Sequence, residues 1–174
     1  MSSRSFTLIE SLVVIAIILI LTALILPDYN FGEKSLLLAA AAAQINQDLR
    51  TIEEMAISAK DFHDFVPQGG YGIYFNSYTS YIIFADCSGN FAYNPSGTFC
   101  NGFSELIEQK SLPGDVQLKS AAPVFPLTIV FTPPTPKVTI EGGASEASVV
   151  LGLKSDSSRT RTIKINNRGL IEFY

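Results

Sequence analysis

Histidine, cysteine and charge are all scarce in this chain, and each scarcity excludes a class of function. The 174 residues include one histidine, His63, and two cysteines, Cys87 and Cys100. That inventory does not supply the four nitrogen and sulfur ligands of a structural zinc site. No glycine-rich phosphate loop is present, and His63 has no serine or cysteine nucleophile beside it in a recognised motif. We therefore predict no enzyme activity, no cofactor and no metal.

Charged residues make up only 16% of the chain, and its net charge is −4. The chain as a whole offers no basic surface for nucleic acid or anionic lipid, so a nucleic-acid partner is not expected. Hydrophobic residues make up 47% of the sequence, and many of them gather in the first 45 residues. This distribution predicts one apolar N-terminal segment followed by one domain of ordinary size.

The N-terminal apolar segment has the length of a membrane span. Residues 6–26 count 21, and a helix of that length covers about 32 Å, close to the hydrocarbon thickness of a bilayer. Arg4 precedes the segment, so the N-terminus is expected on the cytoplasmic side of the membrane and the head on the outer side. Glu10 interrupts the start of this segment. A carboxylate costs roughly 2.5 to 3.5 kcal/mol at the bilayer centre, so we expect Glu10 to have a partner charge.

Two simpler interpretations of this segment each leave a feature unexplained. A cleavable secretory signal would fit Arg4 followed by an apolar run, but the residues after Leu26 offer no pair of small residues for cleavage. A plain single-pass anchor fits the length and the orientation, but it gives Glu10 no role.

The stretch Ser5-Phe6-Thr7-Leu8-Ile9-Glu10-Ser11, with the aliphatic run behind it, resembles the N-terminal motif of type IV pilins and type II secretion pseudopilins. The resemblance implies cleavage by prepilin peptidase between Ser5 and Phe6, followed by N-methylation of Phe6. The family usually has glycine before the cut, where this chain has Ser5. Cleavage would create an ammonium group at Phe6, and the resemblance implies that Glu10 pairs with that group as subunits assemble.

The resemblance also implies a structural role for the chain. It would be a subunit, most simply a minor pilin or pseudopilin, of a type IV pilus or a type II secretion pseudopilus. Its partners would be other subunits, prepilin peptidase, the inner-membrane assembly platform and, before assembly, the membrane. The head would lie outside the cytoplasmic membrane and then in an extracellular or periplasmic filament. On this interpretation residues 1–5 are a leader and residues 6–26 a transmembrane and filament-core helix.

Residues 27–65 are expected to form an amphipathic helix and a linker. Pro27 lacks a backbone donor, and with Gly32 it predicts a joint where the long helix kinks or breaks. One apolar stripe follows: Ile45, Leu49, Ile52, Ala56 and Ala59. The stripe is expected to pack on the chain's own sheet rather than in a separate partner groove. Polar residues, among them Asp48, are expected on the wetter side.

Residues 66–174 are predicted to form a β-rich head, so the fold class is α+β: a long N-terminal helix, membrane-spanning in its first half and amphipathic in its second, packed on an antiparallel sheet. Runs of β-branched and aromatic residues predict strands at 71–75, 81–85, 116–118, 127–131, 137–140, 147–153, 160–165 and 170–173. A short helix capped by Ser104 is expected at 102–110. The last hairpin, with a tight turn at 167–169, is similar to the end of GspH/FimT-like minor pseudopilins.

The stretch from Cys87 to Cys100 is rich in glycine, asparagine and proline, and it leaves three questions open. The two cysteines can form a disulfide, which would indicate an oxidising compartment, or stay as unpaired thiols. The segment 86–90 is faintly like a calcium loop, but it lacks the distal glutamate, so a turn is the preferred interpretation. The aromatic residues Phe91, Tyr93 and Phe99 can be core or adhesive surface.

A basic cluster in the C-terminal hairpin suggests a second function. It consists of Arg159, Arg161, Lys164 and Arg168. Some minor pilins of the resembled group bind DNA through a basic C-terminal turn, but they carry further arginine after the turn glycine. This chain has Leu170, Ile171 and Glu172 there. Solvated charges on a strand face are the simpler interpretation, and DNA uptake is the alternative function.

Overall fold

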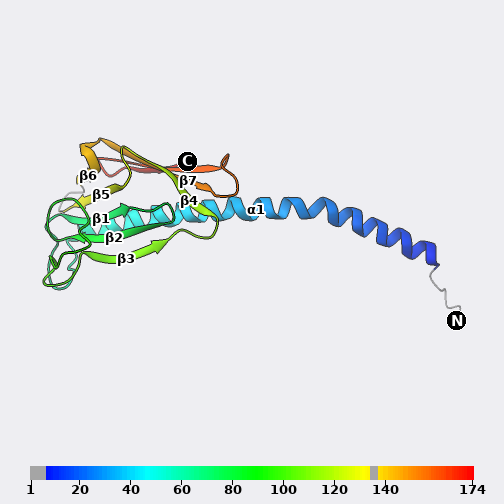
Figure 1. Ribbon diagram of the computed structural model, residues 1–174, viewed down its shortest axis with the longest axis horizontal. Helices are drawn as coiled ribbons and strands as arrows, with labels where there is room; N and C mark the ends of the chain where they lie inside the picture. The colour runs from blue at the N-terminus through cyan, green and yellow to red at the C-terminus, as the bar shows by residue number, and fades with distance from the viewer. Residues whose placement is uncertain (1–6, 134–136) are drawn as a thin grey trace. The chain divides into compact units, whose positions relative to one another are not determined.

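The structure, a computed structural model shown in Figure 1, describes residues 7–133 and 137–174, with backbone alone for residues 25–31. It divides into one unit at residues 1–36 and another at residues 37–174. The predicted α+β class is confirmed, with one long helix followed by nine strands in the described residues. The elements are α1 (Leu8–Ile57), β1 (Gly70–Phe75), β2 (Ser80–Asp86), β3 (Leu106–Ser111), β4 (Val116–Ala122), β5 (Leu127–Thr132), β6 (Lys137–Ile140), the short 3-10 helix η1 (Glu141–Gly143), β7 (Glu146–Leu153), β8 (Thr160–Asn166) and β9 (Ile171–Phe173).

Helix α1 begins where Thr7 caps it. The Thr7 hydroxyl oxygen accepts a hydrogen bond from the Glu10 amide at 3.3 Å, and the Thr7 carbonyl accepts from the amides of Glu10 and Ser11 at 3.1 and 3.2 Å. Threonine followed three residues later by glutamate is the sequence pattern of a capping box. Glu10 therefore lies in the first turn of α1, beside the amide groups that the start of a helix leaves unpaired.

The predicted membrane-spanning first half of the helix is wrong. None of the helices in the described residues is long and apolar enough to cross a membrane. The apolar part of α1 whose side chains are described runs over residues 8–24, which is 17 residues.

The joint predicted at Pro27 and Gly32 is not a break in secondary structure. Helix α1 is assigned without interruption from Leu8 to Ile57, through both positions. The Pro27 side chain lies outside the described side chains. A bend near these residues stays a prediction.

The single sheet that we predict is also wrong, because the strands form two antiparallel sheets. One has the order β3-β2-β1-β5-β6 and the other the order β4-β7-β8-β9. All eight predicted strands are present, most of them within a residue or two of the expected ends, and β4 continues to Ala122. The predicted turn between the last two strands is confirmed: Asn166 accepts the Gly169 amide at 3.0 Å, and Gly169 has φ of 84°.

The short helix predicted at 102–110 is wrong, because β3 occupies most of that segment. Gly102 has φ of 92°, which no right-handed helix contains, and a bridge between Cys100 and Phe103 closes a turn there. Beyond the turn, the chain pairs with β2 in the register Lys110 to Tyr81 and Glu108 to Ile83. The cross-strand bonds outweigh the local preference for a helical turn after Ser104.

The core lies between the second part of α1 and both sheets. The predicted apolar stripe is confirmed at Ile45, Leu49, Ile52 and Ala56, all of which are buried in one cluster with residues of both sheets. Ala59 is exposed, because α1 ends at Ile57 before reaching it. Asp48, expected on the wetter side, is only 7% exposed.

Alkaline pH should destabilise the fold through Tyr71. This side chain is 2% exposed, and its hydroxyl donates to the Lys60 carbonyl just beyond α1. Burial first, and the Asp61 carboxylate second, raise the pKa of Tyr71 from 10.0 to about 12. The folded state therefore holds this proton more tightly than the unfolded state, so the stabilisation is complete below about pH 10 and is lost between about pH 10 and 12. A shift of about two pH units corresponds to a loss of up to about 2.7 kcal/mol.

Urea unfolding across this pH range tests the Tyr71 prediction. Tyr71→Phe should reduce the alkaline loss without abolishing it, because the pKa of the buried Tyr81 is also raised, whereas Tyr78→Phe, at a side chain that is 57% exposed, should leave the loss unchanged. The same alkaline slope in the parent and in Tyr71→Phe would show that other groups cause the loss.

Candidate functional site

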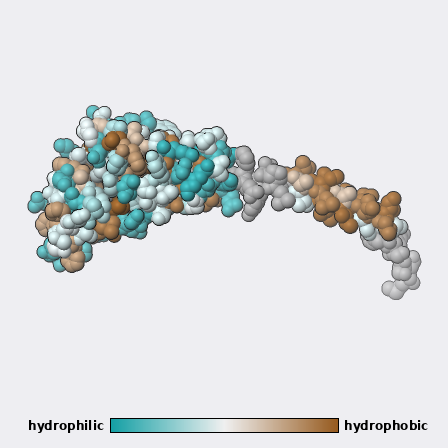
Figure 2. All heavy atoms as spheres, viewed as in Figure 1, coloured by the Kyte–Doolittle hydropathy of each residue, from teal (hydrophilic) through white to brown (hydrophobic). Residues whose placement is uncertain are grey.

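The apolar residues at the start of α1 are exposed on all sides of the helix. Every large apolar side chain from Leu8 to Leu24 is at least 47% exposed. Figure 2 shows this surface as a hydrophobic stretch in the described part of residues 8–24. Monomeric soluble proteins rarely expose continuous apolar surface of this kind, so it marks a contact surface for another apolar partner.

Glu10 is the one carboxylate within this apolar stretch, and it is exposed. Its place in the first turn puts it near the positive end of the helix dipole, which favours negative charge. Ser5 and Phe6 lie outside the described residues, so cleavage between them and N-methylation of Phe6 stay predictions.

The disulfide interpretation of the two cysteines is confirmed. Cys87 and Cys100 are bonded, with their Cα atoms 5.3 Å apart. Both residues are buried, which places the bond at the base of the loop between β2 and β3.

Two fully buried carboxylates organise this loop from inside. The Asp86 carboxylate accepts the amides of Gly89 at 2.8 Å, Asn90 at 3.3 Å and Phe91 at 2.8 Å, and the hydroxyl of Ser88 at 3.1 Å. This is the behaviour of a turn-forming aspartate, so the turn interpretation of 86–90 is confirmed. Among the described residues, no group of three His, Cys, Asp or Glu is placed to hold a metal ion.

Glu105 is the second of these carboxylates, and sequence reasoning missed it. It accepts the Ser88 amide at 3.0 Å and both the amide and the side-chain nitrogen of Asn94, at 2.9 and 3.1 Å. Asp86 and Glu105 are both 0% exposed. Every donor that faces them comes from the loop, so the loop is held as one rigid unit.

The three loop aromatics divide between core and surface. The Tyr93 ring lies 5.5 Å from that of Phe84 and 5.8 Å from that of Tyr74, which makes it part of a small second core. Phe91 and Phe99 are 43% and 49% exposed. The adhesive interpretation therefore concerns Phe91 and Phe99 alone.

A buried polar cluster joins α1 to the edge of the larger sheet. The Asp48 carboxylate accepts the Tyr81 hydroxyl at 2.6 Å and the Lys110 ammonium at 2.7 Å, and the Gln44 amide donates to the Tyr81 oxygen at 3.2 Å. The Asp48 hydrogen bond holds the pKa of Lys110 above its usual range, and burial first, then Asp48, raises the pKa of Tyr81. The sequence carries a signal for this cluster, because position 48 is three residues after Ile45 and four before Ile52, on the apolar face.

The four basic residues of the C-terminal hairpin do not form one basic surface. Arg159 pairs with Asp156 at 3.4 Å, and Lys164 pairs with Glu146 at 3.0 Å. Arg168 lies in the turn between β8 and β9. Arg161 is two residues before the buried Ile163 in β8. Side chains two residues apart in a strand point to the same face, so Arg161 extends from the face that carries the core. Nothing in this arrangement favours DNA binding over solvated charge.

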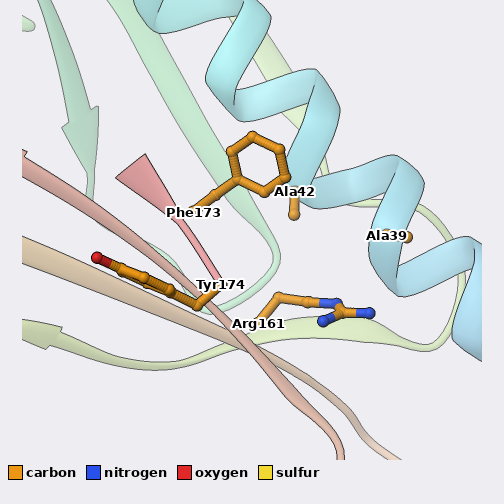
Figure 3. A pocket seen from close by; sticks show the side chains of 5 residues that line it. All are labelled: Ala39, Ala42, Arg161, Phe173 and Tyr174. Atoms are coloured by element: carbon orange, nitrogen blue, oxygen red, sulfur yellow. The ribbon is translucent and has the colours of Figure 1, made fainter. Parts of the chain in front are cut away.

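Arg161 instead lines a pocket of about 330 Å³. The other lining residues are Ala39 and Ala42 of α1, Phe173 of β9 and Tyr174. Figure 3 shows the Phe173 ring directed toward Ala42 and the Arg161 guanidinium extending on the side of Ala39. The Tyr174 hydroxyl donates to the Glu172 carboxylate at 2.7 Å and points away from Arg161. The pocket thus combines an apolar wall with one cation.

Comparison of the chain with models of protein families, with curated proteins and with solved structures found no match. The resemblance to type IV pilins therefore rests on the sequence motif at residues 5–18 and stays a prediction.

Proposed function

We propose that this chain is a structural subunit of a pilin-like or pseudopilin filament, in which the first part of α1 packs against the same segment of neighbouring copies. The observation that carries the proposal is the exposed apolar surface of residues 8–24 with one carboxylate, Glu10, in its first turn. Apolar side chains that none of the described residues covers gain about 25 cal/mol for each Å² that a neighbour removes from water. Equivalent helices of other copies offer a matching apolar surface.

Glu10 sets the register of that packing in this proposal. Prepilin peptidase cuts after Ser5 in this proposal, which leaves a new ammonium group at Phe6, two residues before the first residue of α1 in the sequence. The Glu10 carboxylate of the same chain or of a neighbour offsets that charge. In a poorly hydrated helix bundle, such a pair attracts far more strongly than in water, and Glu10 alone would be penalised.

The compartment of the head follows from its disulfide. Disulfides persist in oxidising compartments and are rare in the cytosol. The bond between Cys87 and Cys100 is buried at the base of a rigid loop, which supports an extracytoplasmic head. The proposal thus places the second unit outside the cytoplasm.

Intact mass spectrometry of the chain from the cells that produce it tests the processing step. The expected result is the loss of residues 1–5 together with the gain of one methyl group at Phe6. An uncut chain, or one cut beyond Leu26, would refute the proposal.

Glu10→Gln is expected to reduce incorporation into sheared or sedimented filaments by at least about tenfold, because an unpaired amide cannot offset the Phe6 ammonium. Glu33→Gln makes the same change at an exposed position of the same helix, and it should assemble normally. Circular dichroism should show both variants folded. Equal incorporation of the two variants would contradict the proposed charge pairing.

A further inference from the structure

The pocket beside Arg161 is built to receive an acidic group. Arg161 is exposed and has no carboxylate partner within the part of the chain that the structure describes. Its four companions supply two small helix side chains and two aromatic rings, so a ligand there meets one cation and an apolar wall. A volume of about 330 Å³ is at the small end of ligand pockets, and it suits a side chain or the tip of a turn.

The open edge of β9 adds unpaired backbone groups beside this pocket. Tyr174 and Thr162 exchange both backbone hydrogen bonds, at 2.9 and 3.1 Å, so alternate residues of the last strand direct their amides toward β8. Phe173, one residue earlier, directs its amide and carbonyl away from β8, because successive residues of an antiparallel strand alternate. A peptide at the pocket can therefore bond to the Phe173 backbone as well as to Arg161.

A matching acidic group lies on a tight turn after α1. The amides and carbonyls of Phe62 and Phe65 exchange hydrogen bonds at 2.9 and 3.2 Å, which closes a tight turn with His63 and Asp64 at its tip. His63 has φ of 55° and Asp64 has φ of 58°, the signature of a type I′ turn, in which glycine or asparagine is usual. Histidine and aspartate are among the non-glycine residues that most often adopt a positive φ, so both side chains fit this turn.

Neighbouring residues fix the tip of this turn. The His63 ring stacks on Phe103 with 3.9 Å between ring centroids, and the Asn101 side chain donates to the His63 carbonyl at 3.3 Å. Asp64 is exposed, and no ion pair of its carboxylate is found in the described residues. The carboxylate is thus presented to solvent on a rigid support.

The turn and the pocket lie at different heights along the axis of α1 in the second unit. The pocket contains Ala42 of α1, and the turn follows the end of α1 at Ile57, 15 residues later. A rise of 1.5 Å per residue separates these two levels by about 22 Å. A contact between unlike surfaces of identical chains is heterologous, and where it does not close into a ring it continues as an open helical array.

We infer that the Arg161 pocket of one copy binds the Asp64 turn of another copy of this chain. The guanidinium and the carboxylate form a charge-assisted pair beside the apolar wall of the pocket. This inference rests on the proposed filament. In that filament, the pocket and the turn supply a contact between heads that the packing of α1 alone does not. Each head carries the Arg161 pocket and the Asp64 turn once, so the contact repeats along the array.

Site-specific disulfide cross-linking of the purified full chain in non-ionic detergent tests the contact. One chain carries Ala39→Cys at the pocket, and a second chain carries Val66→Cys, at a 43% exposed position two residues after Asp64 that leaves the His63 ring on Phe103 in place. Under mild oxidation the mixture is expected to yield a heterodimer, and either chain alone is not. Adding Arg161→Glu to the pocket chain should reduce the heterodimer by about tenfold, because like charges then face each other. Adding Asp64→Lys to the turn chain should restore most of it.

Two further variants keep this test decisive. Arg168→Glu makes the same charge reversal in the same hairpin outside the pocket, and it should leave the yield unchanged. Asparagine adopts a positive φ as readily as aspartate, so Asp64→Asn should keep the turn folded. A reduced heterodimer yield in this variant would therefore result from the loss of the negative charge. Absence of the heterodimer, an equal effect of Arg168→Glu, or failure of the charge swap would overturn the inference. The assay needs neither cleavage after Ser5 nor Glu10. The contact can therefore fail this test while the filament proposal stands, and the filament proposal can fail its own tests while the contact is found.

Discussion

Asp48→Ala is expected to lower the free energy of unfolding by about 3 kcal/mol, one of the two largest effects predicted for a single substitution. Asp48 is 7% exposed and accepts hydrogen bonds from both Tyr81 and Lys110. Removing the carboxylate leaves the Lys110 ammonium without its closest partner and the Tyr81 hydroxyl without its acceptor. The value stands at the low end of the usual range for a broken buried pair, because the Lys110 side chain keeps 24% exposure and regains some water.

Companion substitutions separate the charge from the loss of packing. Lys110→Met removes the stranded cation, so Asp48→Ala combined with Lys110→Met should recover at least half of the lost stability. Tyr81→Phe removes two hydrogen bonds, one to Asp48 and one from Gln44, and should cost about 2 kcal/mol. Glu54→Ala, at an exposed position of the same helix, should change stability by no more than about 0.5 kcal/mol.

Urea unfolding followed by circular dichroism measures these values. If the double variant is no more stable than Asp48→Ala alone, the stranded charge is not the cause of the loss. If Asp48→Ala behaves like Glu54→Ala, the cluster is not a clamp between α1 and the sheet.

Local patterns predicted the strands well, because alternation and turn residues act over a few positions. The strand predicted at 137–140 has the observed ends, and the predicted turn before Gly169 is present. The separation into two sheets depends on which strand pairs with which. For example, β1 pairs with β5, more than fifty residues away along the chain, through Tyr71 and Phe131. No local pattern encodes that choice.

Long-range contacts also explain the positions of the residues that sequence reasoning misplaced. Asp48 is polar and was expected in water, yet Lys110 from another element reaches it and makes its burial favourable. The segment 102–110 has helix-forming residues, but an edge of the larger sheet was open to it, and pairing with β2 prevailed. In both places a partner distant in the chain overrode a local preference.

The candidate site divides in the same way. Glu10, the disulfide and the Asp86 turn are local features and could be predicted from their neighbours in sequence. The Arg161 pocket draws on α1, β8 and β9, so only the fold brings its members together. Glu105 is seventeen residues from Ser88, whose amide it accepts, and no spacing rule links them.

Asp86→Ala is expected to cost about 3 kcal/mol of stability and to loosen the loop between the two cysteines. The carboxylate is 0% exposed and accepts four hydrogen bonds, three of them from backbone amides. Alanine leaves these donors facing a cavity, and each buried donor without an acceptor costs about 1 to 3 kcal/mol unless water enters. Movement of the loop can rehydrate some of them, which is why the expected total is well below the sum of the separate costs.

Hydrogen exchange of the Gly89, Asn90 and Phe91 amides, read together with urea unfolding, tests this result, because those amides should lose protection ahead of the core strands. Gly69→Ala approaches the same carboxylate from the other side, since a Cβ atom there would lie 1.8 Å from an Asp86 carboxylate oxygen, and it should expose the same amides. Asp156→Ala is the matched control, because that aspartate also accepts a backbone amide, from Ser158 at 3.0 Å, but in a surface turn where water can replace it. Unchanged protection in Asp86→Ala would mean that the disulfide and Glu105 hold the loop without Asp86. The rigidity that keeps Phe91 and Phe99 exposed would then originate at the base of the loop rather than in the turn.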